Sequence, residues 1–569
     1  METKKQFSKL VATATLALAS IAPTFAQSNL GSACGCPSVA SRPTVLLSSL
    51  PGFTAIAGTY GGELTTGATL TCANNYIIDQ KIYIPSGQTI TINPGTVLKG
   101  RIAPDGASTP GVPDPAKASA LVIERGGKVM ADGSADCQIV FTAEADPLDG
   151  TFAISNKGQW GGVVILGKAT NNLTLAANGP FVAGGSGKLA VADGLGTIEG
   201  FATSNTQDQY GVNLSTGGVF DDNDNSGILK YVSIRYAGAI LSVGAELNAL
   251  TLGSVGRGTT IEHVELVSSA DDNIEFFGGT VNVKYISGLF GNDDMFDWDL
   301  GWSGKAQFLF GMKTDNTANV DSDNGFEADS DDNKSNNTPR AIPVIYNATI
   351  LGNSKTTTTS DNSSIAAINA KELTGGEIYN SVFANFKNGL NLVKSLGTRT
   401  GTSEAYHNWS ATLGNGSQIL KVKCNTFVGC TNPLTVGSST AGVVAADNTQ
   451  FTTTDMNTIV TGNTLPGFDY TFTVNNTTNV FAQKNDVVPN PALSVAGCPV
   501  APVDGFFRVA NYRGAFASTG DNWLSDWSYS QMLGATKGLV SCPTDINGDG
   551  ITDVSDFLIF APAFNTSCN

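Results

Sequence analysis

Hydrophobic residues along this chain occur in short β-branched runs, separated by glycine, asparagine or aspartate. Clear examples are residues 76–78, 89–92, 121–123 and 139–141. Apolar positions spaced three or four apart, which indicate amphipathic helices, are nearly absent. The pattern predicts an all-β protein with many short strands, which is typical of a sandwich, a propeller or a solenoid. Internal repeats decide between these folds.

One repeat is a strand signature: a Tyr, His or Cys, then Val, Ile or Asn, then any residue and an apolar one. Its copies begin at Tyr231, His263, Tyr285, Tyr346, Tyr379 and Cys424. In three copies an asparagine comes second: Asn347, Asn380 and Asn425. If the copies lie on neighbouring coils, we expect these asparagines to stack and hydrogen-bond as a ladder.

A second repeat is acidic. Residues 271–275 (Asp-Asp-Asn-Ile-Glu) recur 22 residues later at 293–297 and another 30 residues later at 323–327, and a neutral copy spans 387–391. A coil of about 22 residues contains three short strands and three turns, which is the unit of a parallel β-helix. Longer spacings then correspond to insertions at turns. The repeats predict a right-handed parallel β-helix with like residues about 4.8 Å apart on neighbouring coils.

The repeats also set the domain boundaries. The β-helix is predicted over residues 59–500, after a Ser-, Pro- and Gly-rich leader at 27–58 that we expect to be poorly ordered. Residues 501–539 are rich in aromatic side chains and are predicted to cap the open end of the solenoid, which would otherwise expose unpaired backbone. Residues 540–569 form a separate small module.

The N-terminus has the pattern of a secretory signal peptide over residues 1–26. Lys4 and Lys5 precede an apolar stretch at 10–22, and the small-residue pattern of residues 24–26 suits signal peptidase. That stretch is too short to span a bilayer permanently, and no later window reaches the ~18 apolar residues of a transmembrane helix. We therefore expect a secreted or outer-surface protein without a transmembrane segment.

The formal net charge is −17, although only 14% of the residues are charged and only two are histidine. This acidity argues against nucleic acid and anionic membranes as partners. It favours divalent cations and neutral or basic ligands.

The most specific motif lies near the C-terminus. Calcium takes six to eight oxygens, and a twelve-residue loop supplies them from positions 1, 3, 5, 7, 9 and 12. In residues 545–556 these positions hold Asp545, Asn547, Asp549, the Ile551 carbonyl, Asp553 and Asp556. The motif predicts a bound calcium ion; an Asp/Gly-rich surface turn is the alternative.

The loop ends in Asp rather than Glu, and in this it resembles dockerin loops. That resemblance implies a cohesin-like protein partner, although dockerins have two loops and this chain has one. Cys542 and Cys568 bracket the loop and the apolar residues after it. A disulfide between them would staple the module.

The acidic repeat is a second candidate site, because stacking would gather its carboxylates into what we call the acidic column: Asp271, Asp272, Glu275, Asp293, Asp294, Asp297, Asp323 and Glu327. Carboxylates at such spacing repel unless a cation or a proton intervenes. The column could hold a second metal or ligand, its residues could point separately into water, or it could supply the acid/base pair of a glycoside hydrolase or polysaccharide lyase. The catalytic candidates are Asp272, Asp294 and Asp297.

Other features weigh against catalysis. Pectin-cleaving β-helix hydrolases carry Gly-His-Gly and Arg-Ile-Lys elements, and neither occurs here. His263 lies in the strand signature, so we expect it to be a stacked wall residue. Trp298 and Trp302 flank the acidic column and would form a sugar-binding face if exposed. We favour burial at the ends of coils.

All nine cysteines follow the signal peptide, where export permits disulfides. Cys424 and Cys430 are close in sequence and are predicted to pair. The remaining five are Cys34, Cys36, Cys72, Cys137 and Cys498, an odd number that leaves at least one thiol unpaired or paired elsewhere.

Residues 76–530 resemble a family of large secreted β-helix proteins found mainly in Bacteroidetes and their relatives. The resemblance is carried by Pro94-Gly95-Thr96, Trp160-Gly161-Gly162, Glu246-Leu247-Asn248, the Asp-Asp coils and residues 512–516. It implies fold and export, but no activity. We expect a calcium-binding scaffold, adhesin or glycan-binding protein, with a polysaccharide or cell-surface glycan as its ligand. The alternative is a polysaccharide-degrading enzyme that uses the acidic column.

Overall fold

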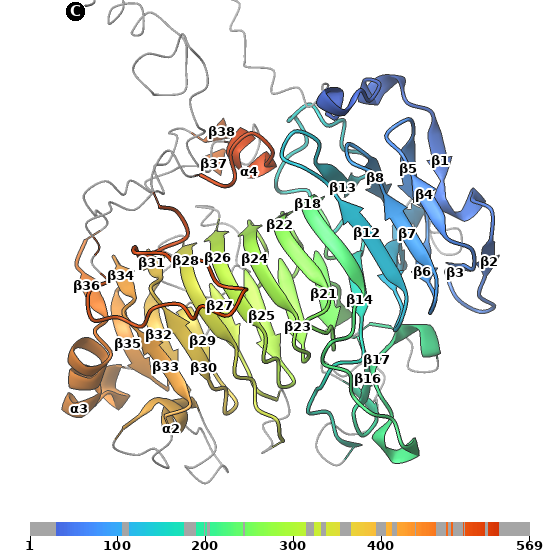
Figure 1. Cartoon of the computed structure of the whole chain (residues 1–569). Helices are drawn as coiled ribbons and strands as arrows, with labels where there is room; N and C mark the ends of the chain where they lie inside the picture. The colour runs from blue at the N-terminus through green and yellow to red at the C-terminus, as the bar shows by residue number, and fades with distance from the viewer. Residues whose placement is uncertain are drawn as a thin grey trace, which may run out of the picture.

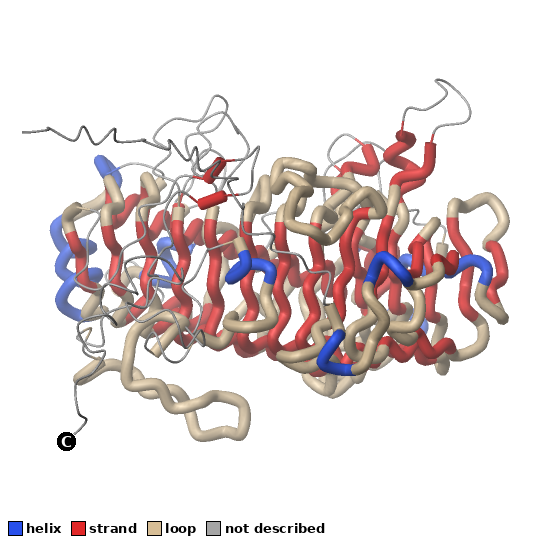
Figure 2. The backbone as a smooth tube through the Cα atoms, turned by 90° about the horizontal axis from the view of Figure 1, so that it is seen from above, coloured by secondary structure: helices blue, strands red, loops and turns tan. Residues whose placement is uncertain are grey.

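Short strands wind into one long solenoid whose coils lie side by side in a single row (Figure 1, Figure 2). Nearly every strand of the two large sheets pairs in parallel with its equivalent on the neighbouring coils. The predicted right-handed parallel β-helix is confirmed. The computed structural model describes residues 30–104, 113–175, 189–198, 200–201, 205–242, 245–313, 324–331, 337–352, 366–393, 405–411, 418–437, 440–462, 474–475, 480–481, 493, 495–517 and 522–533.

Two large sheets form the walls of the solenoid. The larger contains β1 (Thr44–Leu46), β4 (Ala68–Leu70), β5 (Asn75–Ile78), β7 (Thr89–Ile92), β8 (Val97–Gly100), β12 (Lys128–Asp132), β13 (Ile139–Ala143), β18 (Gly227–Arg235), β22 (Thr260–Val267), β24 (Asn282–Leu289), β26 (Lys305–Met312), β28 (Val344–Leu351), β30 (Gly376–Tyr379), β31 (Val382–Ala384), β33 (Leu420–Lys423), β34 (Thr426–Val428) and β36 (Thr458–Val460). The smaller contains β2 (Phe53–Ala55), β3 (Gly61–Leu64), β6 (Lys81–Ile84), β11 (Ala120–Ile123), β14 (Gly162–Leu166), β21 (Leu250–Gly253), β23 (Ile274–Phe277), β25 (Phe296–Asp299), β27 (Phe326–Ala328), β29 (Ala366–Ala370), β32 (Asn388–Leu392) and β35 (Asn432–Val436).

Small elements occur at the turns and ends of the coils. The short pairings involve β9 (Ile102–Pro104) with β10 (Pro113–Ala118), β15 (Leu189–Ala192) with β16 (Leu195–Thr197) and β17 (Gln209–Gly211), β19 (Ile240–Ser242) with β20 (Ala245–Glu246), and β37 (Val474–Asn475) with β38 (Val480–Phe481). The helices, each a turn or so long, are η2 (Ser32–Cys34), η3 (Val39–Ser41), η4 (Leu47–Ser49), η5 (Thr206–Asp208), η6 (Leu214–Thr216), α2 (Ala405–Trp409), η7 (Thr440–Gly442), α3 (Ala445–Thr449), η8 (Gln450–Thr454) and α4 (Tyr529–Met532).

A repeated bend folds the larger sheet into two faces. The strand register aligns one residue of each coil at this bend, and each has φ between +48° and +59°: Tyr231, His263, Tyr285, Phe308, Asn347, Asn380, Cys424 and Met456. This left-handed conformation costs roughly 1–2 kcal/mol for a residue with a Cβ. It is tolerated here because parallel pairing on both sides of the bend holds each coil in the shape of the next.

The interior is filled by columns of apolar side chains. In the smaller sheet Ile274, Phe296 and Phe326 follow one another in register and are buried in the main core. Their neighbours along each strand point the other way, because successive side chains of a strand alternate between its faces. Full burial of each apolar side chain contributes about 1.5–3 kcal/mol.

The asparagine ladder exists, but one position away from the prediction. Asn347 and Asn380 occupy the bend, whereas the bend residue of the next coil is Cys424, so Asn425 lies opposite Ser381. The Oδ1 atoms of Asn425 and Asn457 each accept the backbone N–H of the preceding coil, at 2.9 and 3.0 Å. The prediction that Asn347, Asn380 and Asn425 stack in one column was wrong. Tyr346 and Tyr379 precede the bend, whereas Tyr285 and Cys424 occupy it.

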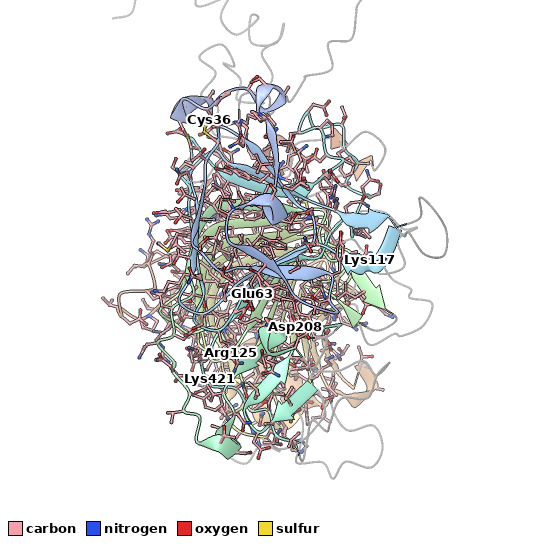
Figure 3. All side chains as sticks on the ribbon, turned by 90° about the vertical axis from the view of Figure 1, so that its right-hand side faces the viewer. Cys36, Glu63, Lys117, Arg125, Asp208 and Lys421 are labelled. Atoms are coloured by element: carbon pink, nitrogen blue, oxygen red, sulfur yellow. A yellow bond between two sulfur atoms is a disulfide. The ribbon has the colours of Figure 1, made fainter. Side chains whose placement is uncertain are left out.

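The predicted leader is part of the fold. Strand β1 pairs in parallel with β5, and β2 pairs with β3. The buried guanidinium of Arg42 donates to the carbonyls of Leu30, Pro37 and Gly95. Disulfides Cys34–Cys137 and Cys36–Cys72 attach this segment to the first coils, and Figure 3 labels Cys36 at this end of the molecule. The expectation of disorder was wrong because these contacts cannot be read from a Ser/Pro/Gly composition.

The aromatic-rich C-terminal segment runs back along the larger sheet and does not cap its open end. We call its described residues, 499–517 and 522–533, the return segment. Arg513 contacts the last coils, the Arg508 N–H donates to Gln307, and the Tyr529 N–H donates to Glu265 on β22. Figure 1 shows α4 close to β22. Aromatic density correctly indicated burial, but it does not specify which surface is covered.

The predicted Cys424–Cys430 disulfide is wrong. Cys424 pairs with Cys498, just before the return segment, and Cys430 is bonded to none of the cysteines that the structure describes. The extended strand β34 (Thr426–Val428) lies between Cys424 and Cys430 and carries them apart, whereas a disulfide needs α-carbons within ~7 Å. Cys542 and Cys568 lie outside the described residues.

Candidate functional site

The acidic column is assembled by the smaller sheet as the repeat predicts. Glu275, Asp297 and Glu327 are in register on β23, β25 and β27. Asp272 and Asp294 precede the first two of these strands by the same two residues, so they lie on neighbouring coils. Asp323 lies outside the described residues.

Asp272 and Asp294 are also rungs of a hydrogen-bond ladder. Asn248 Oδ1 accepts the N–H of Asp272 at 3.2 Å, and Asp272 Oδ1 accepts the N–H of Asp294 at 2.7 Å. In the same way, Asp294 Oδ1 accepts the N–H of Asn324, and Asn324 Oδ1 accepts the N–H of Ala366. One carboxylate oxygen of each aspartate is therefore used to join coils.

Burial changes the acidity of these groups. Asp272 and Asp294 are 5% and 1% exposed. Burial raises the pKa of Asp272 well above its ordinary value, and the carboxylates of Asp271 and Asp293 add to the effect. Burial also raises the pKa of Asp294, although the ammonium of Lys313 opposes it. The charged form of this cluster therefore requires a compensating cation.

Two groups of carboxylates converge on Asp272. One consists of Asp271, Asp272 and Asp293, the other of Asp272, Glu275 and Asp297, and within each group one oxygen per residue lies within 4.8 Å of the others. At the far end of the column, Lys371 forms ion pairs with Glu327 and Asp329. Lys371 thus compensates one end, while at the other end Lys313, whose ammonium bonds to the Asp293 carbonyl, stands beside a larger number of carboxylates.

The three catalytic candidates, Asp272, Asp294 and Asp297, are all buried, the last at 7% exposure. A general acid must reach the oxygen that it protonates, whereas these side chains are enclosed and two of them accept backbone N–H groups. The flanking Trp298 and Trp302 are also buried, each 1% exposed, as favoured from the sequence. They pack with Phe276 and Phe326 in the core and offer no open sugar-binding face.

The C-terminal calcium loop, residues 545–556, lies outside the described residues, and so does the whole of 540–569. Its ligands therefore remain a prediction.

A second candidate site, which sequence reasoning missed, lies between the larger sheet and the return segment. We call it the aromatic cleft; its volume is about 460 Å³. Its lining comprises Tyr231, Glu262, His263, Lys284, Tyr285, Phe308, Arg508, Val509, Tyr512, Ala515 and Trp523. The strand signature predicts that His263 lies in a stacked wall, and the ring contacts confirm this. Only the fold shows that Arg508, Tyr512 and Trp523 cover that wall.

The wall of the cleft is a ladder of aromatic rings at the bend of successive coils. Tyr231 stacks on His263 at 4.4 Å, His263 on Tyr285 at 4.4 Å, and Tyr285 on Phe308 at 4.9 Å between ring centroids. Charged groups stand beside it: Glu262 is 3.3 Å from His263 Nδ1, and Arg508 bonds to the Tyr285 hydroxyl. The site thus combines ring edges with charges of both signs.

A family model described as a pectate-lyase like beta helix domain matches residues 62–466 of the chain. Neither the curated proteins nor the solved structures show a significant match. Among the described residues, no helix is long and apolar enough to cross a membrane.

Proposed function

This chain belongs to the family of pectate-lyase-like β-helix domains, and from that premise we propose that it is an exported, non-catalytic scaffold whose coils are joined by calcium. The fold by itself is compatible with either a scaffold or a polysaccharide-degrading enzyme. The choice therefore depends on the acidic column.

The observation that carries the proposal is the convergence of two carboxylate groups on Asp272. Calcium binds oxygen at 2.3–2.6 Å, so two ligand oxygens on opposite sides of one ion are roughly 4.8 Å apart. Within each group the ligand oxygens all lie within 4.8 Å of one another, close enough to share one ion. Asp271, Asp272, Glu275, Asp293 and Asp297 supply oxygen donors only, which suits calcium better than zinc or copper.

The contacts of the carboxylates support a structural role. Asp272 bonds to the backbone of the next coil, so an ion beside it would tie neighbouring coils together. Without an ion the raised pKa of Asp272 favours its neutral form. Calcium and a proton would then compete for one site, and the ion would stabilise the solenoid in proportion to the calcium concentration.

Export and a second calcium ion complete the proposal. The signal-peptide pattern of residues 1–26 and the disulfides of the described chain suit an oxidising compartment. The loop at 545–556 would bind its own ion and could dock a cohesin-like partner.

Calorimetric titration of residues 27–569 with calcium tests this proposal. The wild type is expected to bind two ions. Asp272→Asn should bind one, because Asp272 belongs to both carboxylate groups of the column and an asparagine keeps the ladder hydrogen bond. Asp549→Asn should also bind one, because it disables only the C-terminal loop. At a hundredfold excess over Kd each site should stabilise by about 2.7 kcal/mol.

Two results would overturn the proposal. If Asp272→Asn still binds two ions, the column is not a calcium site. If the wild type releases new reducing ends from a polysaccharide and Asp272→Asn does not, the protein is a polysaccharide-degrading enzyme rather than a scaffold.

A further inference from the structure

The disulfide between Cys424 and Cys498 joins the solenoid to the start of the return segment. Cys424 occupies the bend of a late coil and is fully buried. Cys498 is half-buried. The guanidinium of Arg513 lies beside the second sulfur, and its Nη2 donates to Cys498 Sγ at 3.8 Å. A permanent positive charge therefore faces one end of this disulfide.

Arg513 is a buried cation without an anionic partner. Its side chain is 6% exposed. Nη1 donates to the Asn425 carbonyl and to the hydroxyls of Thr426 and Thr458. Nε has no hydrogen-bond partner, and among the described residues no carboxylate forms an ion pair with this guanidinium. A buried charge that is not compensated is costly, so an anion at Nη2 would stabilise the site.

Reduction of the disulfide would supply that anion. A positive charge beside a sulfur favours the thiolate over the thiol. An interaction that exists only in the reduced protein shifts the equilibrium toward reduction. In the part of the chain that the structure describes, no lysine or arginine donates a hydrogen bond to a sulfur of Cys34–Cys137 or Cys36–Cys72. The Cys424–Cys498 bond is thus distinguished from the other two by its neighbouring charge.

We propose that Cys424–Cys498 is a thiol-exchange site that fastens or releases the start of the return segment. The co-reactant is a soluble dithiol. One of its thiolates attacks the half-buried Cys498 Sγ, which forms a mixed disulfide and releases Cys424. The second thiolate of the reagent then displaces Cys498 and closes a cyclic disulfide. Two electrons pass from the dithiol to the protein. Of the two protons of the dithiol, one goes to Cys424 and the other to solvent, because Cys498 stays a thiolate beside Arg513.

The disulfide controls the first part of the return segment because the other contacts there are weak. Asn380 Nδ2 donates to the Pro499 carbonyl at 2.9 Å, and Lys305 pairs with Asp504 at the surface. Exposed ion pairs of this kind contribute about 0–1 kcal/mol. The far end is held separately, because α4 is bonded to the buried Glu265. Reduction therefore loosens the segment at its start and leaves its end attached.

This loosening reaches the aromatic cleft. Arg508 and Tyr512 line the cleft and lie between the disulfide and α4 along the chain. When the start of the segment leaves the larger sheet, the ring ladder beneath these two residues becomes exposed to solvent. The redox state of one disulfide thus sets how open the cleft is.

A redox titration of residues 27–569 in saturating calcium tests the proposal. The protein is equilibrated with mixtures of reduced and oxidised dithiothreitol, and differential alkylation with peptide mass spectrometry measures each disulfide. Cys424–Cys498 should be half-reduced at a ratio of reduced to oxidised reagent at least tenfold lower than Cys36–Cys72, which is about 30 mV for two electrons. Cys36–Cys72 is a matched control because both of its cysteines are half-buried.

Arg513→Gln separates the effect of charge from the effect of attachment. Without the cation the thiolate is less stable, so the ratio needed to reduce Cys424–Cys498 should rise about tenfold. If Arg513 only holds the segment in place, the ratio should fall, because two cysteines held less firmly are easier to separate. Lys421→Gln removes a lysine that pairs with Glu377 and should leave the ratio unchanged.

Hydrogen exchange of the oxidised and reduced protein measures the release itself. Exchange at residues 499–512 should become at least tenfold faster on reduction, while residues 523–533 keep their rate. The proposal is overturned if Cys424–Cys498 and Cys36–Cys72 are reduced at the same ratio, if Arg513→Gln lowers the ratio, or if reduction leaves exchange at 499–512 unchanged. None of these results bears on the calcium proposal.

Discussion

At the position of Asp272, an asparagine would make the same ladder hydrogen bond. Asn248 and Asn324 do so on neighbouring rungs, each accepting a backbone N–H through Oδ1. The aspartate therefore adds only charge, and charge is costly in a buried position unless a proton or a cation neutralises it. A substitution at this residue can therefore remove the ion site while the hydrogen-bond ladder stays intact.

Asp272→Asn should destabilise the protein when calcium is present and stabilise it when calcium is removed. Because the pKa of Asp272 is raised in the folded protein, the folded state binds more protons than the unfolded state above about pH 4. Wild-type stability in EDTA should therefore fall as pH rises from 4 toward the folded pKa. The variant lacks this loss and should have the higher Tm in EDTA at neutral pH, but the lower Tm in calcium. Equal Tm values in both conditions would show that Asp272 carries no ion-dependent charge.

Glu124 is a second carboxyl group with altered acidity, at the N-terminal end that Figure 3 views. Burial, together with the carboxylates of Glu63 and Asp208, raises the pKa of Glu124 to about 8, and Arg125 only partly opposes this. Figure 3 labels Glu63, Asp208 and Arg125 around this end of the molecule. The folded protein thus holds a proton here that the unfolded chain releases.

Glu124→Gln should remove a loss of stability between about pH 4.5 and about pH 8. The unfolded carboxyl titrates near 4.3 and the folded one at about 8, so wild-type stability falls as pH rises through this window. Urea midpoints at pH 5 and pH 8.5 measure the change. The variant should gain most at pH 8.5. A gain of the same size at both values would point to packing rather than titration.

Among elements, the return segment is held most firmly where α4 meets β22. Glu265 is fully buried and accepts the N–H groups of Tyr529 and Ser530 and the hydroxyl of Ser530. Arg235 lies 3.7 Å from Glu265 and 4.1 Å from the Tyr529 ring. The strand thus provides a charge that caps the start of a short helix.

Glu265→Gln should detach the end of the return segment. The amide keeps one acceptor, but it loses the charge that lies 3.7 Å from Arg235 and one of the acceptors for the N–H groups of α4, a loss of roughly 1–3 kcal/mol. Hydrogen exchange of residues 523–533 should become much faster, while exchange in β24 and β26 stays slow. Lys421→Gln breaks an exposed pair and should change neither. Slow exchange at 523–533 in Glu265→Gln would show that aromatic packing suffices.

The elements also show where sequence reasoning succeeds. The 22-residue spacing of the Asp-Asp repeat predicts the pairing of β23 with β25, because a parallel coil places equal offsets on top of one another. The sequence repeat aligns Tyr346 and Tyr379 with Tyr285, which differs by one residue from the true register. An aromatic residue can lie just before the bend as well as at it. The path of the return segment could not be predicted, because it depends on contacts with coils more than 200 residues earlier.

For the molecule as a whole, the return segment closes the chain back onto its own solenoid. It is attached near the last coils by the Cys424–Cys498 disulfide and Arg513, and near the middle by Glu265 and Arg235. Coils between these two points contact it through Lys305 and Gln307. The segment therefore joins coils that are not neighbours, and the coils it covers are expected to unfold together.

Replacing both cysteines of this disulfide tests that coupling. The bond spans 74 residues, and closing a loop of this length in the unfolded chain stabilises the folded protein by about 4 kcal/mol in the chain-entropy model. Cys424→Ala with Cys498→Ala should therefore lower the urea midpoint, and β34 and β36 should exchange earlier than β22. Cys430→Ala changes a thiol outside the three disulfides of the described residues and should have a much smaller effect. If all coils still unfold in one transition, parallel pairing alone couples them, and the return segment serves only the cleft.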